Sequence, residues 1–215
     1  MAELTLKAPL SESDTRGLAA GDIVYLDGVI YTGAKLFCEG LVNQGKTPPP
    51  DLSRTNVLLH VHPMMKKVRG EYKLLALGPT SSIMYDAYMP PLIRQLKLRA
   101  ILGKTTLSEA TMKVMQELGC VHLTRVGSPE NTLVEATKSI IAIHFNDDKN
   151  DVEEEATLLL DVAGFGPFIV DIDAHGHNLF RQMEENIDKT MKALYARHGI
   201  RENFEYSSAM SSRRS

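Results

Sequence analysis

The chain has 215 residues, of which 43% are hydrophobic and 24% are charged, and this composition is typical of a globular protein with a substantial core. Its 24 basic and 27 acidic residues give a formal charge of −3, which argues against a dedicated nucleic-acid-binding protein because such proteins carry a basic excess. No apolar run approaches the roughly 20 residues of a membrane-spanning helix, and no secretory signal is visible at the start of the chain, so we expect a cytoplasmic protein.

The first half of the chain is rich in predicted strands. Residues Asp22 to Thr32 contain two β-branched or aromatic runs on either side of Asp27-Gly28, and this arrangement is a strong signal for a β-hairpin. Asn56 to Val61 and Tyr72 to Leu77 are expected to form further strands. The hairpin could form a separate sub-sheet.

In the second half, short apolar runs alternate with helical patterns, as in α/β proteins. We interpret the runs as buried strands because they are nearly continuous in apolar residues. They are Ala100–Leu102, Val121–Thr124, Ile140–Phe145, Thr157–Val162 and Phe168–Ile172.

Three helices are expected in this half. The first is capped by Ser108 and ends at Leu118, the second opens at Ser128-Pro129, and the third runs from about Leu179 to His198. Apolar residues recur in the third helix at a spacing of three or four, which predicts a face that packs in the core. These residues are Phe180, Met183, Ile187, Met191 and Leu194.

The elements together predict a single compact α/β domain over residues 1–200. Residues 201–215 are polar and are expected to form a flexible tail. Inside the domain, the three prolines at positions 48–50 mark an exposed connector, and Asn146 to Glu155 has the composition of a solvated acidic loop.

Two loops carry candidate binding residues. The turn Gly78-Pro79-Thr80-Ser81-Ser82 follows a predicted strand and presents N–H groups and three hydroxyls, which suit a carboxylate or a phosphate. The alternative is an ordinary turn whose hydroxyls bind their own backbone. Gly103-Lys104-Thr105-Thr106 is not a phosphate loop, because Leu98 stands where the upstream glycine is needed. Lys104 still follows a buried strand, where ligands bind in α/β sheets, unless it is a solvated surface lysine.

A third group of polar residues lies before the last helix. Its members are Asp171, Asp173, His175 and His177. The first three alternate along the chain, so they could share one face of a strand end. Together with His60 and His62 they could bind zinc or manganese. The alternative is an internal hydrogen-bond network at a strand-to-helix turn, with Asn178 capping the helix.

The chain has two cysteines, Cys38 and Cys120, which we expect to be reduced. Two scattered cysteines cannot form a four-cysteine zinc site, nor can they supply the usual ligands of an iron–sulfur cluster. We therefore expect no cofactor and no metal in this chain, and the ligands of any cluster would come from another chain.

The order of the motifs resembles a known family. The segment Ala20–Thr32 is followed by GPTSS at 78–82, LGKTT at 102–106 and FGPFIVDIDAHGHNL at 165–179. This series is similar to the β subunit of iron–sulfur-dependent class I hydro-lyases, which are the two-subunit fumarate hydratases and L(+)-tartrate dehydratases. It is also similar to the C-terminal domain of one-chain class I fumarases. The resemblance covers about Leu6 to Arg197.

The resemblance implies a swivelling β/β/α domain that works with an α subunit. That partner would carry a [4Fe-4S] cluster acting as a Lewis acid, in an active site between the subunits. Thr80 is implied as the base for the carbon-bound proton, and Lys104 as a contact to a carboxylate of a small carboxylic acid substrate. The residues implied as further substrate contacts are Ser81, Ser82, Asp173 and His175. We expect a homo- or hetero-oligomer and neither a nucleic-acid nor a membrane partner.

The chain departs from the family pattern at several positions, and three of them replace an arginine or a histidine. Ala34 and Met84 stand where the family has arginines, and Cys38 stands where it has a histidine. Ala34 and Met84 would make the pocket more apolar, so we expect weak activity on fumarate or tartrate. The leading interpretation is a β subunit that adds or eliminates water on a hydroxy acid. The alternatives are a substrate-diverged or non-catalytic relative acting as a binding or regulatory module, and a metal-dependent enzyme using the third group.

Overall fold

The computed structural model describes residues 1–125, 127, 131–145, 152–153 and 156–201. The chain divides into two units, Met1–Leu179 and Phe180–Ser215, and each is described by itself. The predicted tail, apart from Arg201, and the predicted helix start at Ser128-Pro129 lie outside the described residues, as does most of the predicted acidic loop. The predicted domain limit at residue 200 stays a prediction.

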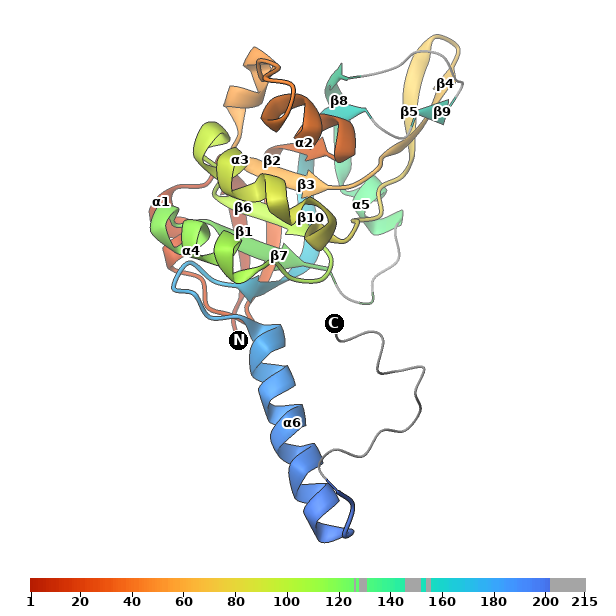
Figure 1. Cartoon of the computed structure of the whole chain (residues 1–215). Coiled ribbons are helices and arrows are strands. Elements are labelled where there is room, and N and C mark those ends of the chain that lie inside the picture. Colours follow the sequence, from red (N-terminus) through yellow and green to blue (C-terminus); the bar gives the residue numbers. More distant parts are fainter. Residues whose placement is uncertain (126, 128–130, 146–151, 154–155, 202–215) are drawn as a thin grey trace. The chain divides into compact units, whose positions relative to one another are not determined.

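The first unit is built on a closed sheet. The strands, in their order across the sheet, are β1 (Glu3–Ala8), β2 (Ile23–Gly33), β3 (Val57–His60), β6 (Ala100–Gly103), β7 (Val121–Thr124), β10 (Thr157–Ile172) and β8 (Thr137–His144). Strand β10 also pairs with β2, so β2, β3, β6, β7 and β10 close into a barrel-like ring (Figure 1). Neighbouring strands from β2 to β7 are parallel, and β10 runs antiparallel to both of its ring neighbours. The mixed α/β class expected from the sequence is confirmed.

The expected hairpin at Asp22–Thr32 is wrong. This segment lies in the single 11-residue strand β2, whose first half pairs with β1 and whose second half pairs with β3. Gly28 has φ of +96°, and a Cβ there would lie 2.6 Å from the carbonyl oxygen of Ala8 on β1. Gly28 is therefore needed for a close passage between two strands and not for a turn.

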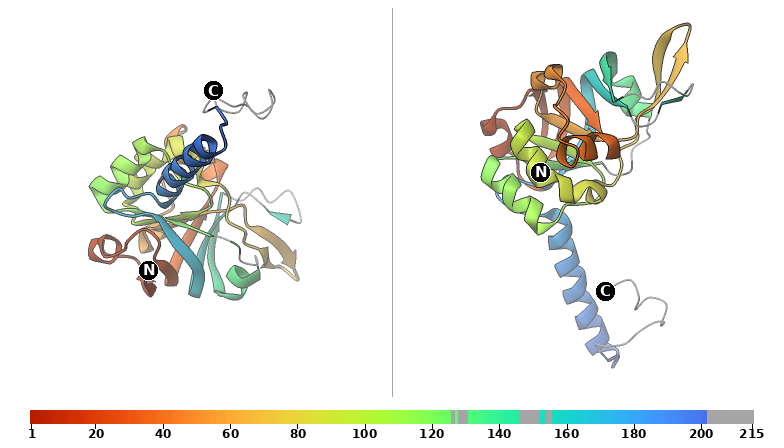
Figure 2. Two further views of the ribbon diagram at one scale, coloured as in Figure 1. Left: turned by 90° about the horizontal axis from the view of Figure 1, so that it is seen from below. Right: turned by 45° about the horizontal axis from the view of Figure 1, so that its top comes forward.

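A small sub-sheet does exist, but different strands form it. Strands β4 (Met64–Val68), β5 (Glu71–Ala76) and β9 (Val152–Glu153) are arranged in the order β5-β4-β9. The views of Figure 2 show the β4–β5 hairpin extending away from the ring. The predicted strand at Tyr72–Leu77 belongs to this hairpin, which connects β3 to the Gly78–Ser82 turn.

The other predicted strands are found, with two differences. The runs at Thr157–Val162 and Phe168–Ile172 belong to one 16-residue strand, β10, whose pairing with β2 shifts register twice between Val162 and Phe168. Strand β8 is half-exposed along much of its length, so the prediction of a buried strand at Ile140–Phe145 is wrong. It lies at the end of the sheet order, where only one neighbouring strand covers it.

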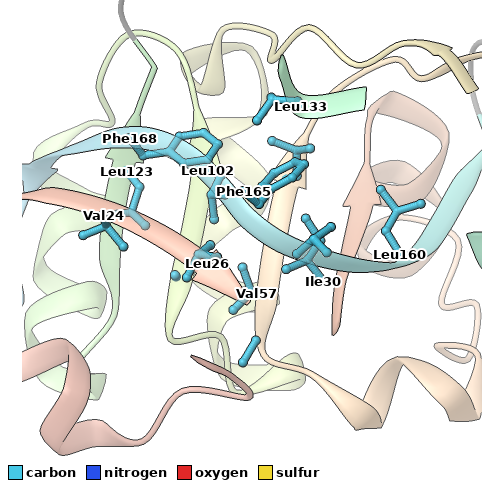
Figure 3. Close-up of a cluster of buried hydrophobic side chains, with 14 of the residues drawn as sticks. Val24, Leu26, Ile30, Val57, Leu102, Leu123, Leu133, Leu160, Phe165 and Phe168 are labelled. Atoms are coloured by element: carbon cyan, nitrogen blue, oxygen red, sulfur yellow. The ribbon is translucent and has the colours of Figure 1, made fainter. Parts of the chain in front are cut away.

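The ring encloses a hydrophobic core, and a second core lies between the ring and its helices. Figure 3 shows the first core, with the buried side chains of Val24, Leu26, Ile30, Val57, Leu102, Leu123, Leu133, Leu160, Phe165 and Phe168. In β3, Val57 and Leu59 belong to this core while Leu58 belongs to the second. Both faces of the ring strands are therefore buried, which explains why they are almost continuously apolar.

Helices surround the ring. They are α1 (Glu12–Arg16), α2 (Lys35–Val42), α3 (Met89–Leu96), α4 (Glu109–Leu118), α5 (Asn131–Glu135) and the 3₁₀ helices η1 (Pro50–Arg54) and η2 (Ser82–Tyr88). Helix α5 contributes Leu133 to the core that the ring encloses. The prediction for α4 is confirmed, because Ser108 Oγ accepts from the Thr111 N–H and Gly119 ends the helix with φ of +65°. Helices α3 and α4 lie side by side on the ring (Figures 1 and 2).

Helix α6 (Leu179–Arg197) forms most of the described part of the second unit. The predicted helix is confirmed, but the prediction that its apolar face is core is wrong, because none of its residues is buried. Met183 and Ile187, for example, are 51% and 57% exposed. A spacing of three or four shows that one face is apolar and does not show what covers that face. Within the described ranges, no helix has both the length and the apolar character needed to cross a membrane.

Candidate functional site

The loops after β5 and β6 meet. The Thr80 N–H donates to the His60 carbonyl at the end of β3 (2.8 Å), and the Lys104 N–H donates to the Thr80 carbonyl (2.9 Å). The Ser82 N–H in turn donates to the Lys104 carbonyl (2.9 Å), and Ser81 forms a parallel β-bridge with Lys104. Four of the predicted site residues, Thr80, Ser81, Ser82 and Lys104, are thus held together next to the carboxyl ends of two parallel strands.

These loop residues differ in how they face the solvent. Lys104 is exposed, and Thr80 and Ser81 are half-buried. The hydroxyl oxygen of Thr80 is itself buried and has no hydrogen-bond partner among the described residues. Thr105 has φ of +61°, which is unusual for a β-branched residue and is found where the surrounding structure holds strain. The loop therefore combines a buried hydroxyl that has no partner among the described residues with an exposed ammonium group.

Ser82 lies in the interior and does not face the solvent. Its side chain is completely buried, and its Oγ lies 2.9 Å from His60 Nδ1 and 2.8 Å from His122 Nε2. A Cβ added at Gly103 would overlap Ser82 Oγ, so the glycine of the LGKTT motif makes room for this hydroxyl. We therefore reassign Ser82 from a direct substrate contact to an internal network, and Thr80 and Ser81 remain the loop's candidate contacts.

The network continues to a carboxylate on β10, the strand that pairs with β7. His122 Nδ1 lies 2.6 Å from Asp171 Oδ1, and both side chains are completely buried. Sequence reasoning missed His122 because it lies inside the apolar run Val121–Thr124. The signal that could have found it is a histidine in a fully buried strand, since a buried polar group needs a partner.

Burial changes the acid–base properties of this network. It lowers the pKa of His60 to about 3, with a further contribution from nearby His122. Burial also raises the pKa of Asp171, and the interaction with His122 opposes part of that rise. His60 is thus neutral at physiological pH, and the carboxyl group of Asp171 binds a proton more readily than an exposed one.

Ser82, His122 and Asp171 have the contact order of a hydrolase triad, in which a histidine links a serine to a carboxylate. A nucleophilic serine must meet its substrate, however, and all three side chains have zero exposure. Ser82 Oγ also has His60 as a second partner. The arrangement therefore does not support a serine nucleophile.

Asp173 and His175 form a second cluster in the turn between β10 and α6. Asp173 accepts from the N–H groups of His175 (2.9 Å) and His177 (3.0 Å), and its other oxygen lies 2.8 Å from His177 Nδ1. Burial alone would raise the pKa of Asp173, but these hydrogen bonds outweigh it and the pKa is lowered. His175 is exposed, and its Nε2 donates to the Arg16 carbonyl (2.9 Å).

The expectation that Asp171, Asp173 and His175 share one face is therefore wrong. Strand β10 ends at Ile172, so Asp171 points into the interior while Asp173 lies in the turn. This cluster matches the alternative of an internal hydrogen-bond network. Its connection to the first site is Asn178, whose amide donates to Thr106 Oγ1 (2.9 Å).

Among the described residues, no three of His, Cys, Asp and Glu are grouped closely enough to bind a metal ion. Cys38 and Cys120 are buried, and burial raises the pKa of each to about 12. Since a metal binds the thiolate, these two thiols are poor ligands. His62 is also engaged, with its Nε2 3.0 Å from the Tyr85 hydroxyl.

The three positions where an arginine or a histidine of the family pattern is replaced lie in different surroundings. Ala34 and Cys38 are 2% and 0% exposed and belong to the core between ring and helices. Met84, on η2, is 68% exposed. Ala34 is therefore packed in the interior and does not line an open pocket. A cavity of about 480 Å³ lies at Pro48–Pro50 and Gln95–Lys97 and includes none of the site residues.

Comparison with known proteins gives a consistent set of relatives. A family model described as "Fumarase C-terminus" matches residues 1–183. A "Putative L(+)-tartrate dehydratase subunit beta" of Methanocaldococcus jannaschii is 29% identical over 188 residues, which cover 86% of this chain and 95% of that protein. The L(+)-tartrate dehydratase subunit beta of Escherichia coli K12 is 24% identical over 82% of this chain and 86% of its own length. A "Putative fumarate hydratase class I" of Geobacillus stearothermophilus is 29% identical over 85% of this chain but only 34% of its own length.

Proposed function

The chain belongs to the Fumarase C-terminus family, and we propose that it is the β subunit of a two-subunit hydro-lyase. The reaction would add water to a double bond next to a carboxylate, or eliminate it from a hydroxy acid of the malate or tartrate type. Two relatives named as tartrate dehydratase β subunits, each covered over more than four-fifths of its length, support this assignment. The compact ring domain would correspond to the swivelling β/β/α domain implied by the sequence.

The partner would be an α subunit. This chain aligns with 34% of the relative named as a class I fumarate hydratase, so the rest of such an enzyme must come from elsewhere if this chain is to act in the same way. We assign the [4Fe-4S] cluster to the α subunit, because the two cysteines here are buried and have raised pKa values. The active site would then lie between the subunits, and we place the complex in the cytoplasm.

The loop residues take roles that match their surroundings. Thr80 would exchange the carbon-bound proton, because its hydroxyl oxygen has no other partner among the described residues. Lys104 would bind a substrate carboxylate through its exposed ammonium group, while its backbone is fixed on both sides by the Thr80 loop. Ser81, half-buried in the same loop, would add a hydroxyl contact. Asp173 and His175 would contact the substrate only from the turn between β10 and α6.

The observation that carries this proposal is the junction of Thr80 and Lys104 at the carboxyl ends of β3 and β6. A second function, a binding or regulatory module without catalysis, is favoured by the buried Ala34 and Cys38. They replace an arginine and a histidine of the family pattern, and buried apolar residues cannot hold a second carboxylate.

The test is to produce this chain together with the α subunit without oxygen and to measure hydration and dehydration. The substrates should include fumarate, tartrate and a panel of hydroxy acids with a single carboxylate. We expect turnover only when both subunits are present, and we expect the mono-acids to be better substrates than fumarate or tartrate. A complex that assembles with an intact cluster but converts none of the acids would favour the binding module.

A further inference from the structure

A chain of four buried polar side chains starts in the Thr80 loop and has no role in the function described so far. His60, Ser82, His122 and Asp171 are all completely buried and are linked in that order by hydrogen bonds of 2.9, 2.8 and 2.6 Å. We propose that this chain is a proton relay, which stores on the His122–Asp171 pair the proton that Thr80 removes from the substrate. The inference rests on the function proposed above.

When Asp171 is ionised, the direction of every hydrogen bond in the relay follows from its partners. An ionised carboxylate can only accept, so His122 Nδ1 must donate to Asp171. In a neutral His122 the other ring nitrogen then accepts, and Ser82 donates its single hydroxyl proton to it. Ser82 Oγ must accept from His60 Nδ1. His60 Nε2 is consequently left with a free lone pair.

A proton that arrives at His60 Nε2 reverses this pattern. His60 passes its Nδ1 proton to Ser82, and Ser82 passes its own proton to His122 Nε2. His122 then carries two N–H groups beside the Asp171 carboxylate. One proton has entered at His60 and has been stored at the far end, and every hydrogen bond in the chain is kept.

The open end of the relay belongs to the residue that binds the backbone of the proposed base. His60 Nε2 and Thr80 Oγ1 are both buried, and neither has a hydrogen-bond partner among the described residues. The two residues are neighbours, because the Thr80 N–H donates to the His60 carbonyl at 2.8 Å. A threonine hydroxyl is a weak base by itself and can accept a proton only if it gives one away. No hydrogen bond joins Thr80 Oγ1 directly to His60 Nε2, so the proton would pass between them through a bridging water molecule.

The surroundings favour storage at the far end. Burial lowers the pKa of His60 to about 3, so His60 hands a proton on and does not retain it. The groups that pack against it are the Tyr85 ring, 4.9 Å away, and His122. Burial raises the pKa of Asp171. A proton that neutralises the negative charge of the His122–Asp171 pair therefore stabilises this pair.

The substrate C–H bond breaks, its electron pair stays on the substrate, and the proton forms a new O–H bond at Thr80. The original Thr80 hydroxyl proton passes to the bridging water, which gives one of its own protons to His60 Nε2. The two transfers through Ser82 follow. One proton leaves the substrate and one arrives at His122. In the reverse direction the stored proton returns to the substrate carbon.

The first test is the protonation state of the histidines in the full chain, read from imidazole nitrogen shifts by NMR as pH is lowered. We expect the His122–Asp171 pair to take up one proton, and His60 to change from the Nδ1–H to the Nε2–H tautomer at the same pH. In Ser82→Ala the two changes should become uncoupled. A His60 that keeps its Nδ1–H tautomer while the pair takes up a proton would overturn the relay. This readout needs no activity, so it is independent of the proposed function.

The second test uses the complex with the α subunit. Ser82→Ala should lower kcat by about 10²-fold and leave KM within about twofold, because Ser82 does not touch the substrate. The matched control is His144→Gln, which removes another histidine–aspartate contact (His144 Nε2 to Asp51, 2.9 Å) on strand β8. An unchanged kcat in Ser82→Ala, or an equal loss in His144→Gln, would refute the relay. A wild-type complex without turnover would instead contradict the proposed function and leave the NMR result to decide on the relay.

Discussion

Single residues determine whether the interior network can exist. Gly103 leaves the space that Ser82 Oγ occupies, since any Cβ at this position would overlap the hydroxyl. His60, Ser82 and His122 are then joined by two hydrogen bonds in the buried interior, while His60 Nε2 has no partner among the described residues. Such buried networks are favourable only when their members are paired, because an unpaired buried polar group costs about 1–3 kcal/mol.

The buried His60 makes the stability of the protein depend on pH. Its pKa is lowered to about 3 by burial, whereas the unfolded chain titrates near the ordinary value of about 6.5. Between these values the unfolded state binds a proton that the folded state does not bind. The free energy of unfolding should therefore fall by about 1 kcal/mol per pH unit as pH drops below 6.5.

The measurement is urea unfolding of wild type and His60→Gln between pH 7 and pH 5. The wild type should lose stability over this range more steeply than His60→Gln, which lacks the titrating group. The raised pKa of Asp171 acts in the opposite sense as pH rises above its ordinary value, and this contribution is present in both proteins. Parallel curves for the two proteins would show that His60 titrates normally in the folded state.

Whole elements could be predicted where their signals are local. Helix α4 was specified by Ser108 and Gly119, whose side chain and left-handed backbone cap its two ends. Thr80 and Lys104 could each be placed after a predicted strand, but their meeting depends on the order of the strands in the sheet. Strand β2 could not be predicted in this way, since the two apolar runs around Gly28 suit a hairpin and a long strand equally. Which of the two forms depends on β1, because Gly28 allows β1 to lie close to β2.

The start of helix α2 gives a prediction at the same scale. Ala34 precedes Lys35 and is 2% exposed, packed in the core between ring and helices. Ala34→Arg should lower the free energy of unfolding by about 3–5 kcal/mol, because it would bury an unpaired charge. Met84→Arg is the control, since Met84 is 68% exposed and should change stability by less than about 0.5 kcal/mol.

Urea unfolding of the two variants at pH 7 makes this comparison. If Ala34→Arg were as stable as wild type, the guanidinium group would have to reach an open pocket from this position. That outcome would restore the picture of Ala34 as part of a substrate pocket, which its burial now contradicts. It would also explain how an arginine fits at this place in the family pattern.

At the scale of the whole molecule, ring closure brings together residues that the sequence keeps far apart. His60, Ser82, His122 and Asp171 come from β3, η2, β7 and β10, and they meet because β7 lies between β6 and β10 in the closed sheet. No local pattern reveals such a set, because His122 and Asp171 each lie within an apolar run. The same closure separates Asp171 from Asp173, which lies beyond the end of β10.

The central claim is that the Thr80 hydroxyl exchanges the substrate proton in a complex with the α subunit. The most direct measurement is kcat for wild type, Thr80→Ser and Thr80→Val in that complex, on whichever hydroxy acid the wild type converts best. Thr80→Ser keeps the hydroxyl, and Thr80→Val keeps the shape and removes it. We predict that Thr80→Val lowers kcat by about 10²–10⁴-fold while Thr80→Ser stays within about tenfold of wild type, with the cluster content unchanged in all three complexes. A kcat for Thr80→Val within a few-fold of wild type would contradict the account.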